Sequence, residues 1–236
     1  AVAREEGLDV ADVRLVGSPP EELTVVENGL SYRVDVLHGQ KTGFYCDQRE
    51  NRRAVARYCE GRRVLDLYSF TGGFALNAAR RGAADRVLAV DSSAPALAVA
   101  RENARLNEIT NVEFEQGDAL KVLERLKAAG DRFDVVVCDP PKYAAHARDL
   151  APALGAYARL NRAALDVLAP GGVLASCSCS GLVDRPTFRD VLAAAAEQAR
   201  RRLQILEQRG QGPDHPVAAP CPETDYLKCT IARAGV

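Results

Sequence analysis

The sequence predicts an α/β protein built on a doubly wound, largely parallel sheet. From residue 62 onward, short apolar runs alternate with longer stretches of helical periodicity, the pattern of repeated βα units. Gly82 and Gly130 follow two of the helical stretches, where glycine commonly ends a helix. The run 133–138 is mostly apolar, as expected of a central strand that is buried on both faces.

The individual elements follow from the same periodicities. We expect strands at 62–68, 85–91, 111–117, 133–141 and 171–179, with helices at 72–82, 94–108, 119–130, near 153–168, and at 185–201. Two further strands are expected at 203–208 and 226–232. The Pro/Gly-rich segment between them leaves no room for a crossover helix, so this last pair should be antiparallel.

The N-terminal part has a different character. Two alternating apolar runs flank Asn28-Gly29, a dipeptide that favours the type I′ turn of a β-hairpin. A helix is expected to begin near Gln48. We therefore predict a small β-rich unit over 1–55, on the RNA side if the protein binds RNA, and a main domain over 56–236.

Composition excludes several classes of protein. The net charge of −1 does not by itself indicate a nucleic-acid binder. No apolar stretch is long enough to span a membrane, and no signal peptide is recognisable, so we expect no membrane partner. The seven cysteines are scattered without a C-x-x-C pair, which predicts no metal site and reduced thiols in the cytoplasm. Since the chain contains no Met, we expect that its natural start is missing.

The first βα turn of the main domain, "VLDLYSFTGGFAL", indicates a ligand site. Gly72 and Gly73 would let the backbone approach a ligand at a helix N-terminus, and Asp91 ends the next strand, where an acid can accept hydrogen bonds from ribose hydroxyls. The turn contains no G-x-G-x-x-G. Asp66 at the strand end would repel a pyrophosphate and suits a ligand with a cationic amino acid end, such as S-adenosylmethionine. A dinucleotide, or a glycine-rich turn without a ligand, remain as alternatives.

Two later strand ends add candidate residues. Asp118 lies where an adenine amino group would be read, although an aspartate there also suits a helix N-cap. In "CDPPKY" the carboxylate of Asp139 could accept hydrogen bonds from an amine of the substrate or the cofactor. An acid followed by two prolines at the end of a fourth strand is typical of methyltransferases that act on a planar amine or base.

Five motifs together resemble a known family. The motifs are "HGQKTGFYCDQRENR", "VLDLYSFTGGFAL", "DPPKY", "SCSGL" and "DHPV…YLK". They resemble, in the same order, those of bacterial large-subunit (23S) ribosomal RNA cytosine-C5 methyltransferases. These are class I S-adenosylmethionine-dependent enzymes with a Rossmann-like seven-stranded sheet. Full-length members begin with an RNA-binding PUA domain, and we expect that this chain lacks it. The resemblance implies cofactor contacts at Gln48, Arg49, Asp66, Ser69, Phe70, Thr71, Gly72, Asp91, Ser92, Asp118 and Asp139.

The resemblance also implies a covalent reaction. Its cysteine falls on Cys179, whose thiolate would add to C6 of a flipped-out cytosine and make C5 nucleophilic. Cys177 would share a face with Cys179 if the strand continued, but we expect Cys177 and Cys138 to be buried core residues. Asp139 would pair near N3 or N4 of the base, and the group that accepts the C5 proton is unassigned. Substrate contacts are expected at Pro140, Lys142, Tyr143 and His215, with Tyr143 or Phe44 stacking on the base.

Other functions fit the same motifs. A methyltransferase acting on a guanine or adenine nitrogen of rRNA would not need Cys179. A catalytically silent module that binds S-adenosylmethionine would bind it without transferring methyl groups to RNA. A homodimer is a further expectation, and the sequence does not choose the methylated nucleotide.

Overall fold

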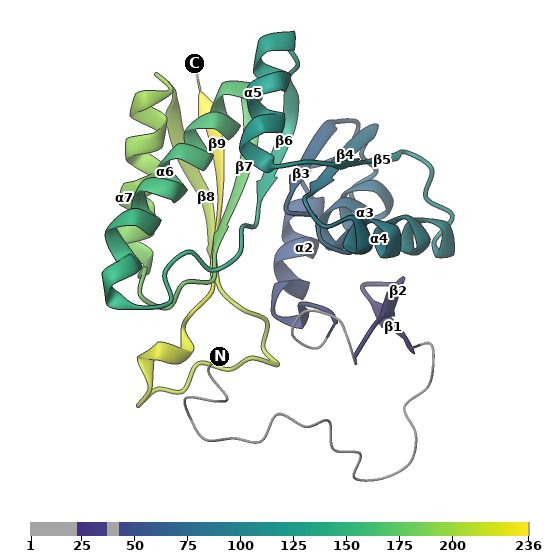
Figure 1. The fold of residues 1–236 in the computed structure, drawn as a ribbon, viewed down its shortest axis with the longest axis horizontal. Coiled ribbons are helices and arrows are strands. Elements are labelled where there is room, and N and C mark those ends of the chain that lie inside the picture. Colours follow the sequence, from purple (N-terminus) through teal and green to yellow (C-terminus); the bar gives the residue numbers. More distant parts are fainter. Residues whose placement is uncertain (1–22, 37–42, 236) are drawn as a thin grey trace.

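The computed structural model of the chain describes residues 23–36 and 43–235 and confirms the expected α/β architecture (Figure 1). Seven strands form one sheet in the order β5-β4-β3-β6-β7-β9-β8. Their bounds are β3 Arg63–Leu67, β4 Arg86–Asp91, β5 Val112–Gln116, β6 Phe133–Cys138, β7 Leu168–Ser178, β8 Arg202–Arg209 and β9 Lys228–Gly235. Strands β3 to β7 pair in parallel, whereas β9 is antiparallel to both β7 and β8, as predicted for the last pair.

Helices cover both faces of the sheet, at α2 Arg49–Ala56, α3 Gly73–Arg80, α4 Ala94–Leu106, α5 Ala119–Ala129, α6 Leu150–Val167 and α7 Arg185–Gln198. In β6, Val135 and Val137 belong to the core under α2 and α3, while Val136 and Cys138 belong to the core under α5, α6 and α7. This division follows from the two-residue period of a strand. All four side chains are fully buried, which explains the apolar run in the sequence.

Several boundaries lie one to three residues from those expected from the sequence, including the starts of α6 and β7. Helix α6 begins at Leu150 rather than near residue 153, because Pro152 lies in the first turn, where a missing N–H costs no helical hydrogen bond. Strand β7 begins at Leu168 rather than at residue 171 and includes the two glycines of "PGG". Neither shift alters the order of the elements.

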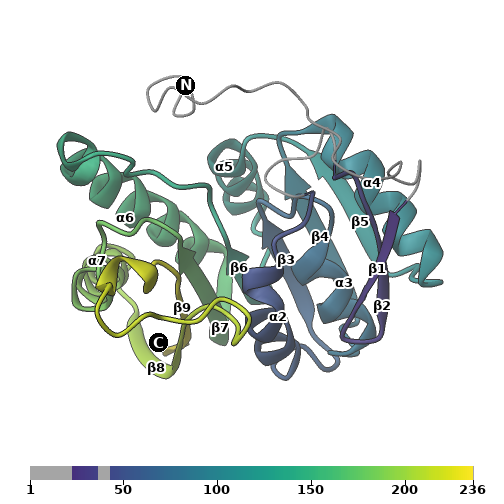
Figure 2. The ribbon, with the colours of Figure 1, turned by 90° about the horizontal axis from the view of Figure 1, so that it is seen from below.

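The predicted hairpin is present as β1 Leu23–Glu27 and β2 Leu30–Val34. Its two-residue turn places Asn28 at φ 54° and Gly29 at φ 76°, the positive values that a type I′ turn requires. The hairpin lies beside α3 and α4 (Figure 2), where Tyr32 packs near Leu76 and its hydroxyl accepts a hydrogen bond from Asn77 Nδ2 at 3.0 Å. The "HGQK" part of the motif at 38–41, like residues 1–22, lies outside the described residues.

Candidate active site

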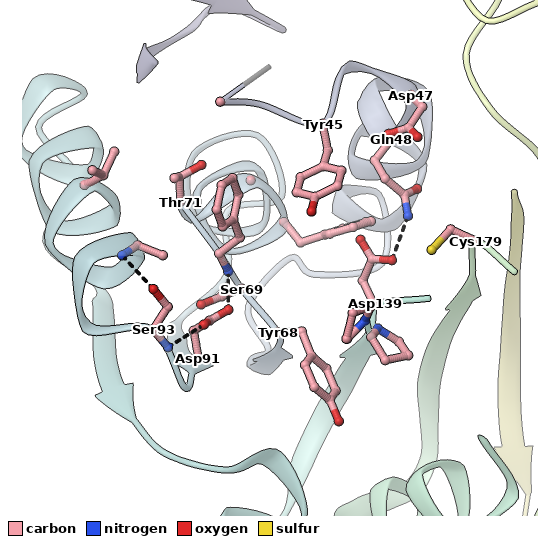
Figure 3. Close-up of a pocket in the computed structure, with 18 of the residues that line it drawn as sticks. Tyr45, Asp47, Gln48, Tyr68, Ser69, Thr71, Asp91, Ser93, Asp139 and Cys179 are labelled. Atoms are coloured by element: carbon pink, nitrogen blue, oxygen red, sulfur yellow. Dashed lines mark hydrogen bonds between the residues drawn. The ribbon is translucent and has the colours of Figure 1, made fainter. Parts of the chain in front are cut away.

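A cavity of 530 Å³ lies at the carboxyl ends of β3, β4, β6 and β7 (Figure 3). The carboxyl ends of parallel strands meet at one edge of the sheet, and the strand order reverses there between β3 and β6. Helix α2 and the turn before it supply a further wall. The volume suits a ligand of cofactor size.

The turn between β3 and α3 has an unusual backbone. Tyr68, Phe70 and Gly72 have φ values of 62°, 49° and 88°, and two of these residues carry side chains that disfavour such angles. Strained backbone of this kind persists where surrounding interactions impose it, and it clusters at binding sites. Here the Phe70 amide donates to Asp91 Oδ2 at 2.8 Å, which fixes the turn against the end of β4.

The carboxylate of Asp91 is held in one orientation. Its Oδ2 accepts the Phe70 hydrogen bond, and its Oδ1 accepts a hydrogen bond from the Ser93 amide at 2.8 Å. Each carboxylate oxygen can accept a second hydrogen bond, and Asp91 lines the cavity. The geometry therefore fits the expected contact with ribose hydroxyls.

Two buried donor atoms at the cavity have no hydrogen-bond partner among the described residues. They are Ser69 Oγ and Arg52 Nε, both on residues that line the cavity. The Arg52 guanidinium also lies against Gly73, where a Cβ atom would come within 2.5 Å of Nε. Unsatisfied buried donors of this kind call for a ligand with polar groups. A guanidinium and a hydroxyl fit the carboxylate end of an amino acid such as that of S-adenosylmethionine.

Arg52 is fixed by the hairpin. Its Nη1 donates to both carboxylate oxygens of Glu27, at 2.8 and 2.9 Å, and its Nη2 donates to the Tyr45 carbonyl at 2.8 Å. The guanidinium also stands over the Phe44 ring, with Cζ 4.5 Å from the ring centroid. The hairpin thus holds a cation at the cavity.

Asp66 is buried behind the glycine turn and is not among the residues that line the cavity. Its Oδ2 accepts a hydrogen bond from the Ala75 amide at 2.8 Å, near the N-terminus of α3. Burial raises the pKa of Asp66 to about 8, against the opposing effect of this backbone donor. The structure therefore gives Asp66 a role in supporting the turn, and a direct cofactor contact stays a prediction.

Asp139, at the end of β6, is positioned by a chain of hydrogen bonds. Gln48 Nε2 donates to Asp139 Oδ1 at 2.9 Å, and Gln48 Oε1 accepts from Asn51 Nδ2 at 2.7 Å. Asn51 Oδ1 in turn accepts from Arg209 Nε at 3.1 Å. Gln48 and Asn51 are buried, so this chain has few ways to rearrange. Gln48 thus orients Asp139, and the cofactor contact expected for Gln48 from the sequence stays a prediction.

The cysteines separate clearly by environment. Cys179 follows the last residue of β7, is partly exposed and lines the cavity, whereas Cys177 and Cys138 are fully buried, as expected. A hydrogen bond with the Cys229 thiol, together with burial, raises the pKa of Cys177 well above its ordinary value. Burial likewise raises the pKa of Cys138. Among the described residues, Cys179 is the only cysteine that lines the cavity.

Most of the predicted site residues meet at this cavity, and some do not. The predicted residues that line it are Gln48, Ser69, Phe70, Thr71, Asp91, Ser92, Asp139, Pro140, Lys142 and Cys179. The others, besides Asp66, are Arg49, Gly72, Asp118, Tyr143 and His215. Gly72 is the left-handed N-cap of α3, beside the lining residue Gly73.

The remaining four outlying residues have partners of their own. Asp118 caps α5 by accepting a hydrogen bond from the Lys121 amide at 3.0 Å, the alternative role foreseen for it. Arg49 and His215 both contact Asp214. The hydroxyl of Tyr143 lies 3.0 Å from that of Tyr68. Their predicted contacts with cofactor or substrate stay predictions.

Several residues at the cavity were missed from the sequence, namely Arg33, Tyr45, Asp47, Arg52, Tyr68 and Ser93. Arg52 could have been found, because Gln48 and Arg52 are four residues apart at the start of a helix and so share one face. Arg49 lies about 100° further round that helix. Phe44, expected as an alternative stacking residue, is buried against Tyr32, and Tyr45 lines the cavity in its place.

The described parts of the chain were also searched for membrane and metal features. Over 23–36 and 43–235, none of the helices combines the length and apolar character needed to cross a membrane. The same residues contain no group of three or more His, Cys, Asp or Glu side chains that could hold a metal ion.

The structure combines a Rossmann-like sheet, a carboxylate at the end of β4 and a cavity at the switch point. This combination defines the class of Rossmann-like enzymes that bind a nucleotide-containing cofactor. The comparison with protein families agrees. The chain belongs to the S-adenosylmethionine-dependent methyltransferase family, whose model matches residues 4–228. The cofactor is therefore S-adenosylmethionine, which fits the polar groups described above.

Individual relatives point in the same direction. The chain is 44% identical to the ribosomal RNA large subunit methyltransferase I of Aeromonas salmonicida and 42% identical to that of Escherichia coli, over 99% of its own length in each case. It spans only 60% and 59% of those relatives. A solved putative methyltransferase complexed with SAH has a TM-score of 0.83 at 23% identity, covering 92% of this chain and 57% of that one. This last similarity shows the fold.

Proposed function

We propose that this protein is an S-adenosylmethionine-dependent enzyme that methylates C5 of a cytosine in 23S rRNA. The observation that carries the proposal is the position of Cys179, a partly exposed thiol beside Asp139 at the cofactor cavity (Figure 3). The names of the relatives, which are ribosomal RNA large subunit methyltransferases, support the RNA substrate.

The chemistry requires a nucleophile because C5 of cytosine is unreactive. The Cys179 thiolate adds to C6, forming the Sγ–C6 bond and moving an electron pair towards C5. Bound S-adenosylmethionine supplies the methyl group that C5 takes up. Loss of the C5 proton to a base then returns the electron pair, breaks the Sγ–C6 bond and frees the thiolate.

Asp139 is the residue that recognises the base in this proposal. Its Oδ1 accepts a hydrogen bond from the Gln48 amide, and because each carboxylate oxygen can accept more than one hydrogen bond, Asp139 can also accept one from the exocyclic amine of cytosine. The target base has to leave its helix or be unpaired to reach the cavity. The cavity around Asp139 is also lined by Tyr45, Pro140 and Lys142. A role for Tyr143 in stacking on the base is part of the proposal.

The proposal extends to the rest of the molecule. Residues 1–55 would face the RNA as a unit distinct from the methyltransferase domain over 56–236. Arg49 and Asp118 would contact the cofactor, Asp118 near its adenine, and His215 would lie on the substrate side. A homodimer and a cytoplasmic location belong to the same proposal. Size-exclusion chromatography with light scattering tests the dimer.

Covalent trapping tests the central claim. The protein and its Cys179→Ala and Cys177→Ala variants are incubated with S-adenosylmethionine and a 23S rRNA transcript that contains 5-fluorocytidine. Fluorine at C5 cannot leave as a proton, so the thiol adduct persists on a denaturing gel. Circular dichroism and S-adenosylmethionine binding establish that each variant is folded.

We expect an adduct with the unmodified protein and with Cys177→Ala, and none with Cys179→Ala. Loss of the adduct only in Cys177→Ala would show that the wrong thiol has been chosen. Methyl transfer to RNA that survives in Cys179→Ala would favour methylation of a guanine or adenine nitrogen. Cofactor binding with neither adduct nor methyl transfer would favour the silent module.

A further inference from the structure

Lys228, in the "YLK" motif, is buried next to the nucleophile. Its side chain is only 2% exposed, although lysine is rarely buried without a partner. It occupies the first position of β9, directly opposite Ser178 at the end of β7. Cys179 is the next residue after this pairing, so the ammonium lies under the segment that presents the thiol.

The ammonium is held by two backbone carbonyls. Nζ donates to the Ser180 carbonyl at 2.6 Å and to the Tyr226 carbonyl at 2.7 Å. These account for two of its three N–H groups, and both acceptors are neutral. Lys228 has no salt bridge among the described residues. Asp225, which directly precedes Tyr226, instead pairs with Arg185 at 2.8 Å.

A buried cation without a bound carboxylate is costly unless a nearby anion compensates it. The charges around Lys228 identify that anion. Burial lowers the pKa of Lys228 to about 8, and the negative charge of a Cys179 thiolate is the largest effect that opposes this change. Asp225 and Asp184 act in the same direction, and Arg185 acts against them.

We propose that Lys228 is a positioning residue that holds Cys179 as a thiolate and stabilises that thiolate each time it leaves C6. The inference rests on the proposed function, in which Cys179 is the nucleophile. An adjacent cation lowers the pKa of a thiol. Asp139, Tyr45, Tyr157 and Tyr226 are the other titratable groups that face Cys179, and the carboxylate of Asp139 opposes the thiolate.

The steps balance without a further reagent. The Cys179 S–H proton passes to water before the base arrives, and Lys228 keeps its own three protons throughout. The Sγ–C6 bond then forms and later breaks as described above, so the same thiolate is regenerated beside the same ammonium. Lys228 contacts neither substrate nor cofactor in this scheme.

Alkylation of Cys179 tests the inference without RNA. The rate of iodoacetamide labelling is followed against pH by peptide mass spectrometry for the unmodified protein, Lys228→Met, Lys228→Arg and the matched control Lys127→Met. Lys127 is half exposed on α5 and pairs with Asp166. Labelling of the exposed Cys46 in the same samples provides an internal reference.

We expect the labelling midpoint of Cys179 to lie below that of Cys46 and to rise by about one pH unit in Lys228→Met, a tenfold fall in rate at neutral pH. Lys228→Arg should retain most of the effect, and Lys127→Met should change nothing. A Cys179 midpoint at or above that of Cys46 in the unmodified protein would overturn the inference even if Lys228→Met did not fold. A low, Lys228-dependent midpoint without any RNA adduct would instead count against the proposed function alone.

Discussion

The ion pair between Glu27 and Arg52 allows a sharp test of how the hairpin supports the site. Both side chains are buried, with 6% and 5% exposed, and two hydrogen bonds of 2.8 and 2.9 Å join them. Burial raises the pKa of Glu27, and this effect outweighs the opposing attraction of Arg52. The pair is therefore not a large source of stability in itself, but either charge without the other is costly.

Glu27→Ala leaves the Arg52 guanidinium buried without its counter-ion. Breaking a buried ion pair in this way costs roughly 3–5 kcal/mol of unfolding free energy. Glu102→Ala is the matched control, because it removes the other hairpin ion pair, Arg33–Glu102, whose side chains are 34% and 30% exposed. An exposed pair of this kind contributes only about 0.2–1 kcal/mol.

Urea unfolding at pH 7 measures both changes. With an m-value of about 3 kcal/mol/M for a domain of this size, Glu27→Ala should lower the midpoint by about 1 M or more. The double variant Glu27→Leu with Arg52→Met should recover most of that loss, since apolar replacement of a buried pair is often neutral. It should not recover cofactor affinity, because the guanidinium at Gly73 is gone. Equal losses for Glu27→Ala and Glu102→Ala would refute the reasoning.

Two further predictions concern the acids of the site. The pKa of Asp66 is about 8 in the folded protein and near 3.8 in the unfolded chain. Protonation of Asp66 therefore stabilises the cofactor-free fold at low pH. This contribution to the unfolding free energy falls by roughly 1.4 kcal/mol per pH unit as the pH rises to about 8. Asp66→Asn should flatten the stability profile between about pH 5 and 8 in urea unfolding, and an unchanged slope would contradict the assignment. Asn51→Ala removes a bond that orients Gln48 and, through it, Asp139, so kcat for methyl transfer should fall about tenfold, a loss of ~1.4 kcal/mol in activation free energy. The affinity for S-adenosylmethionine, measured by calorimetry, should change less than twofold. Equal losses in kcat and affinity would place Gln48 at the cofactor instead.

Much of the fold could be predicted because its signals are local. The apolar run of β6, the Asn28-Gly29 turn and the glycine after α5 each specify an element without reference to the rest of the chain. The antiparallel pairing of β8 and β9 followed from the missing crossover helix. What the sequence did not reveal was how the hairpin packs on α3 and α4, because that contact depends on residues such as Tyr32 and Asn77 that are far apart in sequence.

The site was predictable at strand ends and less so elsewhere. Asp91 is the last residue of β4, and Asp139 and Cys179 directly follow β6 and β7, so the topology alone brings all three to one edge of the sheet. Arg52 and Lys228 were not predicted as site residues. The helical spacing of Gln48 and Arg52 indicates the first, whose long side chain reaches the cavity from α2. The second depends on a contact between distant segments, because Lys228 extends from β9 to the Ser180 carbonyl beside Cys179.

The strand order explains how a methyl donor and the proposed nucleophile can meet in this fold. Asp91 and the glycine turn belong to β4 and β3, on one side of the switch point, whereas Asp139 and Cys179 belong to β6 and β7, on the other. Transfer therefore has to occur across the boundary between β3 and β6. Helix α2 bridges that boundary. Gln48, at its start, donates a hydrogen bond to Asp139, whereas Arg52, one turn later, lies against Gly73. A change in the tilt of α2 would misalign the two halves together. Substitutions that tilt the whole helix should therefore affect cofactor binding and base recognition jointly, unlike Asn51→Ala, which removes a single hydrogen-bonding side chain.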